Sequence, residues 1–448
     1  METPPQITGA TPEPLASASD PAPAPWSPAR RLAFRFCFIY FTLYGLSNQI
    51  IGGLVVIPDV NVTDLGDRWP LRPLTLWTAA HIFGMRQPLV AFETGSGDRA
   101  FDWVLTFCLL GIAAALTALW SVPDRRRPHY VAMRKWFRLF LRLALASEML
   151  LYGLAKVIPT QMPFPYLTRL MEPYGNFSPM AALWYSVGAS PAYEIFAGCA
   201  ETVGGLLLLA PRTATLGALI SLADLIQVFV LNMTYDVPVK LYSFHLILFA
   251  LYLLAPEARR LCDFFFSNRA VAPSAEPPLF STRRAHRLAI ALQILFGLYL
   301  AGMNIHQGIK SWTTRGGGRP RPSLYGIWNV EQMSMDGQLR PPLLTDNGRW
   351  RRVFFDAMTQ TSFQRMDMTF ANYPSTLNDS ANTLTLTKND DKSWKAAFTF
   401  NRPAPDQVIL DGAMDGHKLH LELKLFDRNK LQLVSRGFHW INDFPYQR

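Results

Sequence analysis

The stretch AYEIFAGCAETVGGLLLLAPRTATLGALISLAD, residues 192–224, indicates the fold class of this chain. It contains one apolar segment and the start of a second, joined by a short linker with Pro211 and Arg212. A helix of about 20 apolar residues is long enough to cross the hydrocarbon of a bilayer. The stretch therefore predicts two neighbouring membrane-spanning helices joined by a tight basic turn.

Five more apolar segments of this kind lie between residues 30 and 307, so we predict a membrane all-α bundle of about seven transmembrane helices. In the long linker 58–101 we expect a short interfacial helix near Leu74–Phe83, with the linker as a lid on the bundle. The predicted spans are Leu32–Ile57, Asp102–Val122, Phe137–Ile158, Ala192–Ala210, Thr213–Thr234, Leu241–Ala255 and Leu288–Gln307.

Lys and Arg residues fall mainly on one side of these spans, 15 against six. Basic linkers stay cytoplasmic, so we expect a cytoplasmic N-terminus. The odd number of crossings then places the chain after Gln307 outside, in the periplasm if the membrane is a bacterial inner membrane. The 15 residues on the inner side are Arg30, Arg31, Arg125, Arg126, Arg127, Arg134, Lys135, Arg138, Arg212, Arg259, Arg260, Arg269, Arg283, Arg284 and Arg287.

The composition excludes several classes of function. The net charge of +10 comes from basic residues beside apolar segments, which favours a role in topology and indicates no nucleic-acid partner. Four cysteines without a CxxC motif support neither a disulfide framework nor a dithiol redox centre. Residues 1–29, rich in Pro, Ala and Ser, predict a disordered tail. No Walker loop, GxGxxG, GxSxG, HExxH or CxxCH motif is present.

A different periodicity begins at about Tyr325, after a linker at 308–324. In KLHLELKL, residues 418–425, leucines alternate with polar residues, which is typical of a half-buried strand. Similar runs, including LQLVSRGF at 431–438, predict about eight antiparallel strands in a meander sheet or small barrel over 325–448. The sequence Gly326-Ile327-Trp328 resembles the first-strand GxW of lipocalin-type barrels, although Trp328 could equally be an ordinary core residue.

Several ionisable residues lie inside the predicted spans, where they are costly and often mark function. Glu148, Tyr152 and Lys156 share one face of a helix over two turns. These groups could form interhelical ion pairs, or they could bind a quinone head group, relay protons or hold a small anion. The candidate catalytic residues are Glu148, Lys156, Glu201 and Asp224, the candidate cofactor-binding residues are Tyr152, Gln227 and His245, and no metal site is expected.

The block 142–255 resembles the DoxX family of small bacterial membrane proteins. The resemblance rests on YGLAKVIP at 152–159, on the stretch 192–224, and on Arg142, Lys156, Glu201 and Arg212, which take the places of the family's polar residues. It implies a four-helix membrane unit, and some members are linked to thiosulfate and quinone oxidation or to redox-stress complexes. Two added spans before the unit, and one span with a strand domain after it, depart from the usual short pattern.

Two functional hypotheses follow, and the sequence leaves open whether the protein is an enzyme. The first is a DoxX-like integral membrane protein with a buried polar site near the outer leaflet, acting as a quinone-linked redox component. The second is a non-catalytic membrane anchor that displays a periplasmic β domain for a lipid, a peptide or an envelope partner protein. Under both hypotheses the lipid bilayer is a partner. The first adds a quinone or a small anion, and the second adds an envelope protein.

Overall fold

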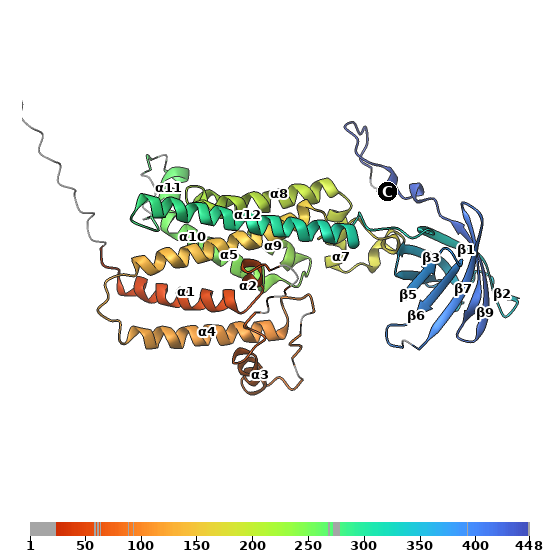
Figure 1. Ribbon diagram of the computed structural model, residues 1–448, viewed down its shortest axis with the longest axis horizontal. Helices are drawn as coiled ribbons and strands as arrows, with labels where there is room; N and C mark the ends of the chain where they lie inside the picture. Colours follow the sequence, from red (N-terminus) through yellow and green to blue (C-terminus); the bar gives the residue numbers. More distant parts are fainter. Residues whose placement is uncertain are drawn as a thin grey trace, which may run out of the picture.

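The computed structural model describes residues 24–446, except 58, 59, 61, 63, 88, 93, 268, 272–277 and 392. An elongated bundle of helices occupies one part of the molecule, and a β-barrel lies beyond one end of it (Figure 1). Most of the predicted disordered tail, residues 1–23, lies outside the described residues.

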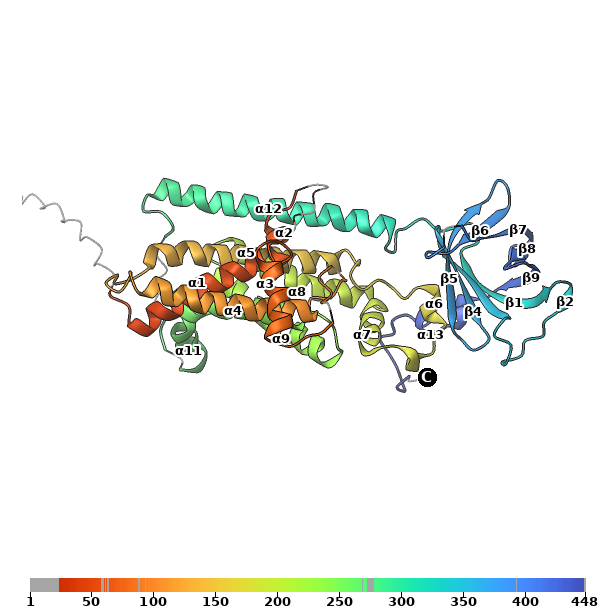
Figure 2. The same ribbon diagram turned by 90° about the horizontal axis from the view of Figure 1, so that it is seen from below.

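The long helices run side by side along the bundle, with their ends gathered at two opposite ends (Figures 1 and 2). They are α1 (Pro28–Leu46), α4 (Ala100–Ser121), α5 (Val131–Val157), α8 (Pro191–Leu209), α9 (Ala214–Thr234), α10 (Lys240–Leu254) and α12 (Arg283–Thr314). Shorter helices connect or flank them: α2 (Ile50–Leu54), α3 (Leu71–His81), α6 (Leu167–Leu170), α7 (Pro179–Gly188), α11 (Ala258–Phe266), and the 3₁₀ turns η1 (Tyr174–Asn176) and η2 (Ala255–Glu257).

Among the described residues, five helices are long and apolar enough to cross a membrane by length and composition. They are α4, α8, α9, the continuous run Lys240–Phe266 and α12. Helices α5 and α12 extend beyond their predicted spans, because hydropathy marks only the apolar part of a helix and both begin with a basic turn. The short helix expected near Leu74–Phe83 is confirmed as α3.

The prediction of one continuous span over Leu32–Ile57 is wrong. Helix α1 ends at Leu46, and α2 begins only at Ile50. The polar residues Ser47, Asn48 and Gln49 lie between them, and the Asn48 side chain accepts a hydrogen bond from the Ile50 N–H at 3.1 Å. Such a local bond offers the backbone an alternative to the helix, so the chain turns here.

Glycines allow α5, α8 and α9 to approach closely. A side chain at Gly153 would meet Thr202 of α8, and one at Gly198 would meet the Gly153 carbonyl. A side chain at Gly217 of α9 would similarly meet the α8 backbone. Small residues at helix contacts bring backbones together and increase packing.

Arg35 interrupts the apolar sequence of α1, yet its side chain is buried. It donates to the Tyr130 hydroxyl and to the Ser121 hydroxyl, both at 2.7 Å, and lies 3.7 Å from the Asp124 carboxylate. The Tyr130 hydroxyl also donates to Asp124 and holds the pKa of that carboxyl below its usual range. The charge of Arg35 is thus paired where α4 turns into α5.

The C-terminal strands form an antiparallel barrel of eight strands, closed where β1 pairs with β9. The expectation of a small barrel of about eight strands is confirmed, and β2 only extends β1 as a short hairpin. The strands are β1 (Gly326–Met335), β2 (Gln338–Leu339), β3 (Trp350–Ala357), β4 (Gln360–Arg365), β5 (Phe370–Asn378), β6 (Thr383–Thr387), β7 (Lys395–Ala404), β8 (Gln407–Met414) and β9 (His417–Leu425).

The predicted strand at 431–438 is wrong. The segment forms the short helix α13 (Gln432–Ser435) instead, directly after the 3₁₀ turn η3 (Arg428–Lys430). Because β9 already pairs with both β8 and β1, the closed barrel offers this segment no edge to join. Alternation alone could not reveal that closure.

Large apolar side chains fill the barrel interior. Trp328, Met333, Phe363 and Phe398 belong to one buried cluster, and the Trp328 indole N–H donates to the Leu324 carbonyl at 2.8 Å. A barrel of eight strands is narrow enough for side chains to fill its interior. Trp328 is therefore a core residue.

The barrel contacts the bundle through the loop that follows α5 (Figure 2). The Asp356 carboxylate of β3 accepts a hydrogen bond from the Leu167 N–H at 2.9 Å and pairs with Arg319, beyond α12, at 2.6 Å. Leu167 also packs with Ile327 and Phe354 in a small apolar cluster. The end of the bundle next to the barrel is called the barrel end below, and the other end the basic end.

Candidate functional site

A polar pocket of about 320 Å³ opens at the barrel end of the bundle. Its walls come from the end of α1, the turn before α2, the loop before α4 and the first turn of α10. The lining combines aromatic side chains with carboxylates, hydroxyls and amides. It includes Tyr44, Asn48, Gln49, Asp64, Asp67, Thr94, Ser96, Arg99, Phe101, Asp102, Tyr152 and Tyr242.

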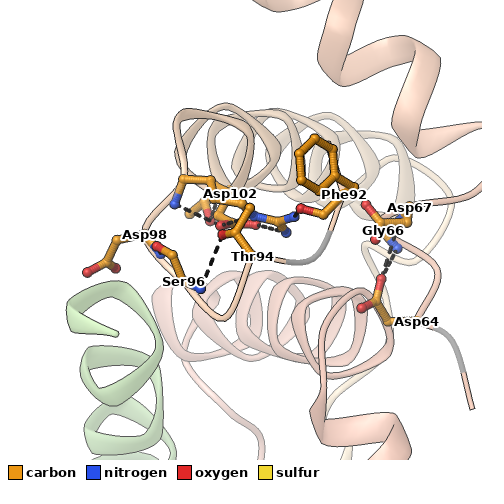
Figure 3. Close-up of polar contacts among 10 residues, drawn as sticks. Asp64, Gly66, Asp67, Phe92, Thr94, Ser96, Asp98 and Asp102 are labelled. Carbon is orange, nitrogen blue, oxygen red and sulfur yellow. Dashed lines mark hydrogen bonds and ion pairs between the residues drawn. The ribbon is translucent and has the colours of Figure 1, made fainter. Parts of the chain in front are cut away.

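Short side chains shape the loop over this pocket by bonding to the nearby backbone (Figure 3). The Thr94 hydroxyl accepts from the Ser96 N–H at 3.3 Å, and the Ser96 hydroxyl accepts from the Asp98 N–H at 3.2 Å. Across the pocket, the Asp64 carboxylate accepts from the Gly66 N–H at 2.9 Å. Side chains of these types favour such turns, which explains why the TGSGD sequence forms a compact loop.

Two aspartates attach this loop to helices. Asp102 pairs with Arg99 at 2.8 Å and accepts the Arg99 N–H, which caps the start of α4. The Asp98 carboxylate accepts the N–H groups of Lys240 and Leu241, both at 2.8 Å, at the start of α10. Both carboxylates have structural partners, because a helix N-terminus favours an acidic acceptor.

Glu148 is fully buried and is not itself a lining residue, but Gln49 and Tyr242 of the lining face its carboxylate. Within the described part of the chain, neither carboxylate oxygen makes a hydrogen bond of ordinary geometry, although the side chains of Tyr242, Ser147 and Gln49 face it. A side chain at Gly53 of α2 would collide with this carboxylate, so the glycine leaves it room. A buried carboxyl in such surroundings can gain or lose a proton with small local movements.

Tyr152 lies one helical turn after Glu148 on α5 and lines the pocket. Its hydroxyl accepts a hydrogen bond from the Gln49 amide at 2.6 Å, and both residues line the pocket. The sequence pattern correctly places Glu148, Tyr152 and Lys156 on one face of α5. In the structure, however, their partners differ: Tyr152 bonds to Gln49, whereas Lys156 bonds to Glu201 of α8.

Lys156 and Glu201 form a buried ion pair between α5 and α8. The Lys156 ammonium donates to both carboxylate oxygens of Glu201, at 2.6 and 2.7 Å. Asp224 of α9 is the nearby acidic neighbour of this pair, as its electrostatic interaction with both residues shows. The structure therefore supports an interhelical role for Lys156 and Glu201, and it places neither in the pocket lining.

The other two candidates also lie outside the pocket lining. Gln227 has an exposed position on the surface of α9. His245 is buried, and its ring nitrogens bond to the Tyr40 hydroxyl and the Leu241 carbonyl, both at 2.7 Å. Its ring also stacks on Tyr44, with centroids 3.7 Å apart. Within the described ranges, no group of three or more His, Cys, Asp or Glu is placed to hold a metal ion.

Sequence reasoning missed Gln49, Tyr242 and the loop residues of the pocket. Gln49 is a polar residue inside an apolar run, a signal that could have been used. Tyr242 carries no such signal, because a tyrosine at the start of an apolar helix is common at a membrane interface. Its position depends on α10 packing against α5.

Comparisons with known proteins show a relationship to a bacterial protein. No family model matches the sequence, and no solved structure matches it. The Bacillus subtilis (strain 168) protein named uncharacterized protein YwoB is 34% identical over 134 residues, which cover 30% of this chain and 85% of YwoB. The chain belongs to the YwoB family. Most of the chain lies outside the region shared with YwoB, so this member carries additional elements.

Proposed function

We propose that this protein is a DoxX-like integral membrane protein whose barrel-end pocket binds a quinone head group, as a component of a quinone-linked redox system. Glu148 is the group that exchanges a proton with the ligand. The observation that carries the proposal is the buried Glu148 carboxyl, which Gln49 and Tyr242 of the pocket lining face.

The proposal includes seven crossings of an inner membrane, with the barrel in the periplasm. The proposal adds α1 and α5 to the five apolar helices. Most of their charges are buried or lie near a helix end, and Arg142, in the middle of α5, is hydrogen-bonded to Gln293 of α12. The helix ends and turns with most of the basic residues gather at the end opposite the barrel (Figure 1). This distribution is what a cytoplasmic basic end requires.

The chemistry of the lining suits a quinone. The Gln49 amide and the tyrosine hydroxyls can donate hydrogen bonds to quinone carbonyl oxygens, and Tyr44 and Phe101 add aromatic surface to the lining. A pocket of about 320 Å³ lies at the lower end of the usual size for small-ligand sites. Reduction to a quinol takes up two electrons and two protons. Glu148 supplies one proton, water that enters the open pocket supplies the second, and a redox partner supplies the two electrons.

The test is a titration of the purified full-length protein with decylubiquinone, followed by tryptophan fluorescence. Tyr152→Phe should weaken binding about fivefold, because it removes a hydroxyl whose hydrogen bond contributes about 1 kcal/mol. Glu148→Gln should remove the dependence of affinity on pH, because no carboxyl then remains to exchange the proton.

The matched control is Tyr252→Phe, which makes the same chemical change on α10 outside the pocket lining. It should leave the affinity unchanged. Wild-type affinity in Tyr152→Phe, together with wild-type pH dependence in Glu148→Gln, would reject the site.

A second candidate function is display of the barrel to an envelope protein. Its support is the segment after α13, where Phe438, Trp440, Ile441 and Phe444 are each at least 77% exposed. The filled barrel interior argues against a lipid bound inside it. Removal of residues 437–448 should abolish cross-linking to such a partner while quinone binding persists, and unchanged cross-linking would reject this function.

A further inference from the structure

A second and larger cavity lies at the basic end, away from the barrel-end pocket. Its volume is about 710 Å³, and its walls come from α5, the turn between α8 and α9, the end of α10, α11 and α12. This cavity shares no lining residue with the barrel-end pocket. It is called the basic-end cavity below.

The lining of the basic-end cavity is strongly cationic. Five Lys or Arg residues and one His contribute to it, and none of the described lining residues is acidic. Such a set attracts an anion, and cavities of this kind between membrane helices suit acidic lipid head groups. The six residues are Lys135, Arg138, Arg142, Arg212, Arg260 and His286.

Hydrogen bonds position several of these side chains. Lys135 donates to the Pro278 carbonyl and Arg138 to the Leu253 carbonyl, both at 2.9 Å. Arg142 donates to the Gln293 side chain, which joins α5 to α12. The six basic residues lie on α5, on the α8–α9 turn, on α11 and on α12, so they face the cavity from several of its walls.

Two buried nitrogen atoms at this cavity suit an oxygen-rich ligand. Arg260 donates to Glu257 at 3.0 Å, but its Nε has no hydrogen-bond partner among the described residues. The same holds for Nδ1 of His286. A buried polar atom without a partner costs free energy, and phosphate oxygens would accept hydrogen bonds from such donors.

The remaining lining is apolar. Leu216 and Leu219 of α9 and Leu139 of α5 contribute to it, together with Phe264 and Phe265 of α11. Leu216 and both phenylalanines are exposed in the protein alone, as expected of side chains that face lipid. A ligand that combines an anionic group with hydrocarbon chains matches both kinds of wall.

We propose that the basic-end cavity binds the phosphate group of an anionic phospholipid, with the acyl chains along the apolar wall. The cavity lies at the end of the bundle where α8 turns into α9. Turns between spanning helices lie at the membrane surface, which is the depth of the lipid head groups of that leaflet. The proposal is independent of the quinone site, since the two cavities have different residues and lie at opposite ends.

The test uses the full-length protein in dodecyl maltoside micelles and follows thermal unfolding by tryptophan fluorescence. Palmitoyl-oleoyl phosphatidylglycerol should raise Tm, whereas the matching phosphatidylcholine and inorganic phosphate should not. Arg212→Gln should weaken the apparent affinity for phosphatidylglycerol about fivefold, which corresponds to the loss of one cation near an anionic head group. Arg212 has an exposed side chain on a turn, so the variant should fold.

Arg126→Gln is the matched control, because it removes the same charge at the same end from an exposed residue outside the cavity. It should keep the wild-type affinity, and Lys135→Gln should repeat the effect of Arg212→Gln. Equal stabilisation by phosphatidylcholine, or equal losses in the Arg126 and Arg212 variants, would overturn the proposal. If inorganic phosphate alone reproduced the rise in Tm, the lipid would be wrong and the cavity would bind a soluble anion.

Discussion

The helical bundle and the barrel differ in what they bury. Within the described residues, the barrel buries Arg349 and no carboxylate, and its core consists of large apolar side chains. The bundle buries several charged groups besides its apolar core. They are Arg35, Glu148, Lys156, Glu194, Glu201 and Glu257.

A buried charge costs free energy unless it is paired and hydrogen-bonded. Most of those in the bundle meet this condition: Lys156 pairs with Glu201, and Glu194 accepts the Met162 N–H at 2.9 Å. Glu148 differs, because no such bond reaches its oxygens from the described residues. The comparison therefore distinguishes three kinds of burial. Apolar side chains stabilise the barrel, paired charges join helices of the bundle, and the Glu148 carboxyl is the centre of the proposed site.

The largest effect is expected in the barrel. Trp328→Ala should destabilise it by about 3–5 kcal/mol, because a large buried ring is replaced by a cavity. Chemical denaturation followed by near-UV circular dichroism measures the loss, and far-UV helix content should be retained. Trp440→Ala, at a residue that is 91% exposed, is the control and should have no effect.

The next effect tests whether charges join the helices. Lys156→Met should destabilise the bundle by about 3 kcal/mol, because it leaves the Glu201 carboxylate buried without its partner. The double variant Lys156→Met with Glu201→Leu should recover most of this loss. Thermal unfolding in detergent provides the measurement, and a double variant no better than the single one would contradict a structural pair.

A smaller effect is expected at the loop over the barrel-end pocket. Asp98→Ala should cost about 1 kcal/mol, because it removes the cap at the start of α10. Hydrogen exchange at the Lys240 and Leu241 amides should become faster. If exchange in that turn were unchanged, the loop would not hold α10 as described.

The smallest effect is a pH dependence of the barrel. A hydrogen bond with Asp411 raises the pKa of His420 above its ordinary value of 6.5. Since the folded barrel holds this proton more tightly, its contribution to stability is present below pH 6.5 and is lost as pH rises through the raised pKa. Denaturation at a series of pH values should show this loss in wild type and not in His420→Asn. His439→Asn, in the segment after the barrel, should behave as wild type.

The sequence predicted those features that depend on local pattern. Apolar length located α4, α8, α9 and α10 to within about two residues, and alternation located β9. The break at Ser47–Gln49 was missed because three polar residues lower the mean hydropathy of the 26-residue segment Leu32–Ile57 only slightly. The missing strand at 431–438 depends on barrel closure, which is a long-range pairing.

The site was predictable only in part. Helical spacing placed Glu148 and Tyr152 together, because they lie about one turn apart on α5. It could not show that Lys156 turns toward Glu201 while Tyr152 meets Gln49, since partner choice depends on how α8 and the α1–α2 turn pack on α5. The basic-end cavity was also not predicted, because its basic residues come from four separate segments of the chain.

The two contacts made by the Asp356 carboxylate restrict how the barrel can move relative to the bundle. This carboxylate binds both the loop after α5 and the linker between α12 and β1. The barrel is therefore attached to the bundle at two places and not only through the linker. Rotation of the barrel about the α12 linker would have to break the contact with Leu167. Whatever docks on the barrel therefore meets it in a fixed orientation relative to the helix axes.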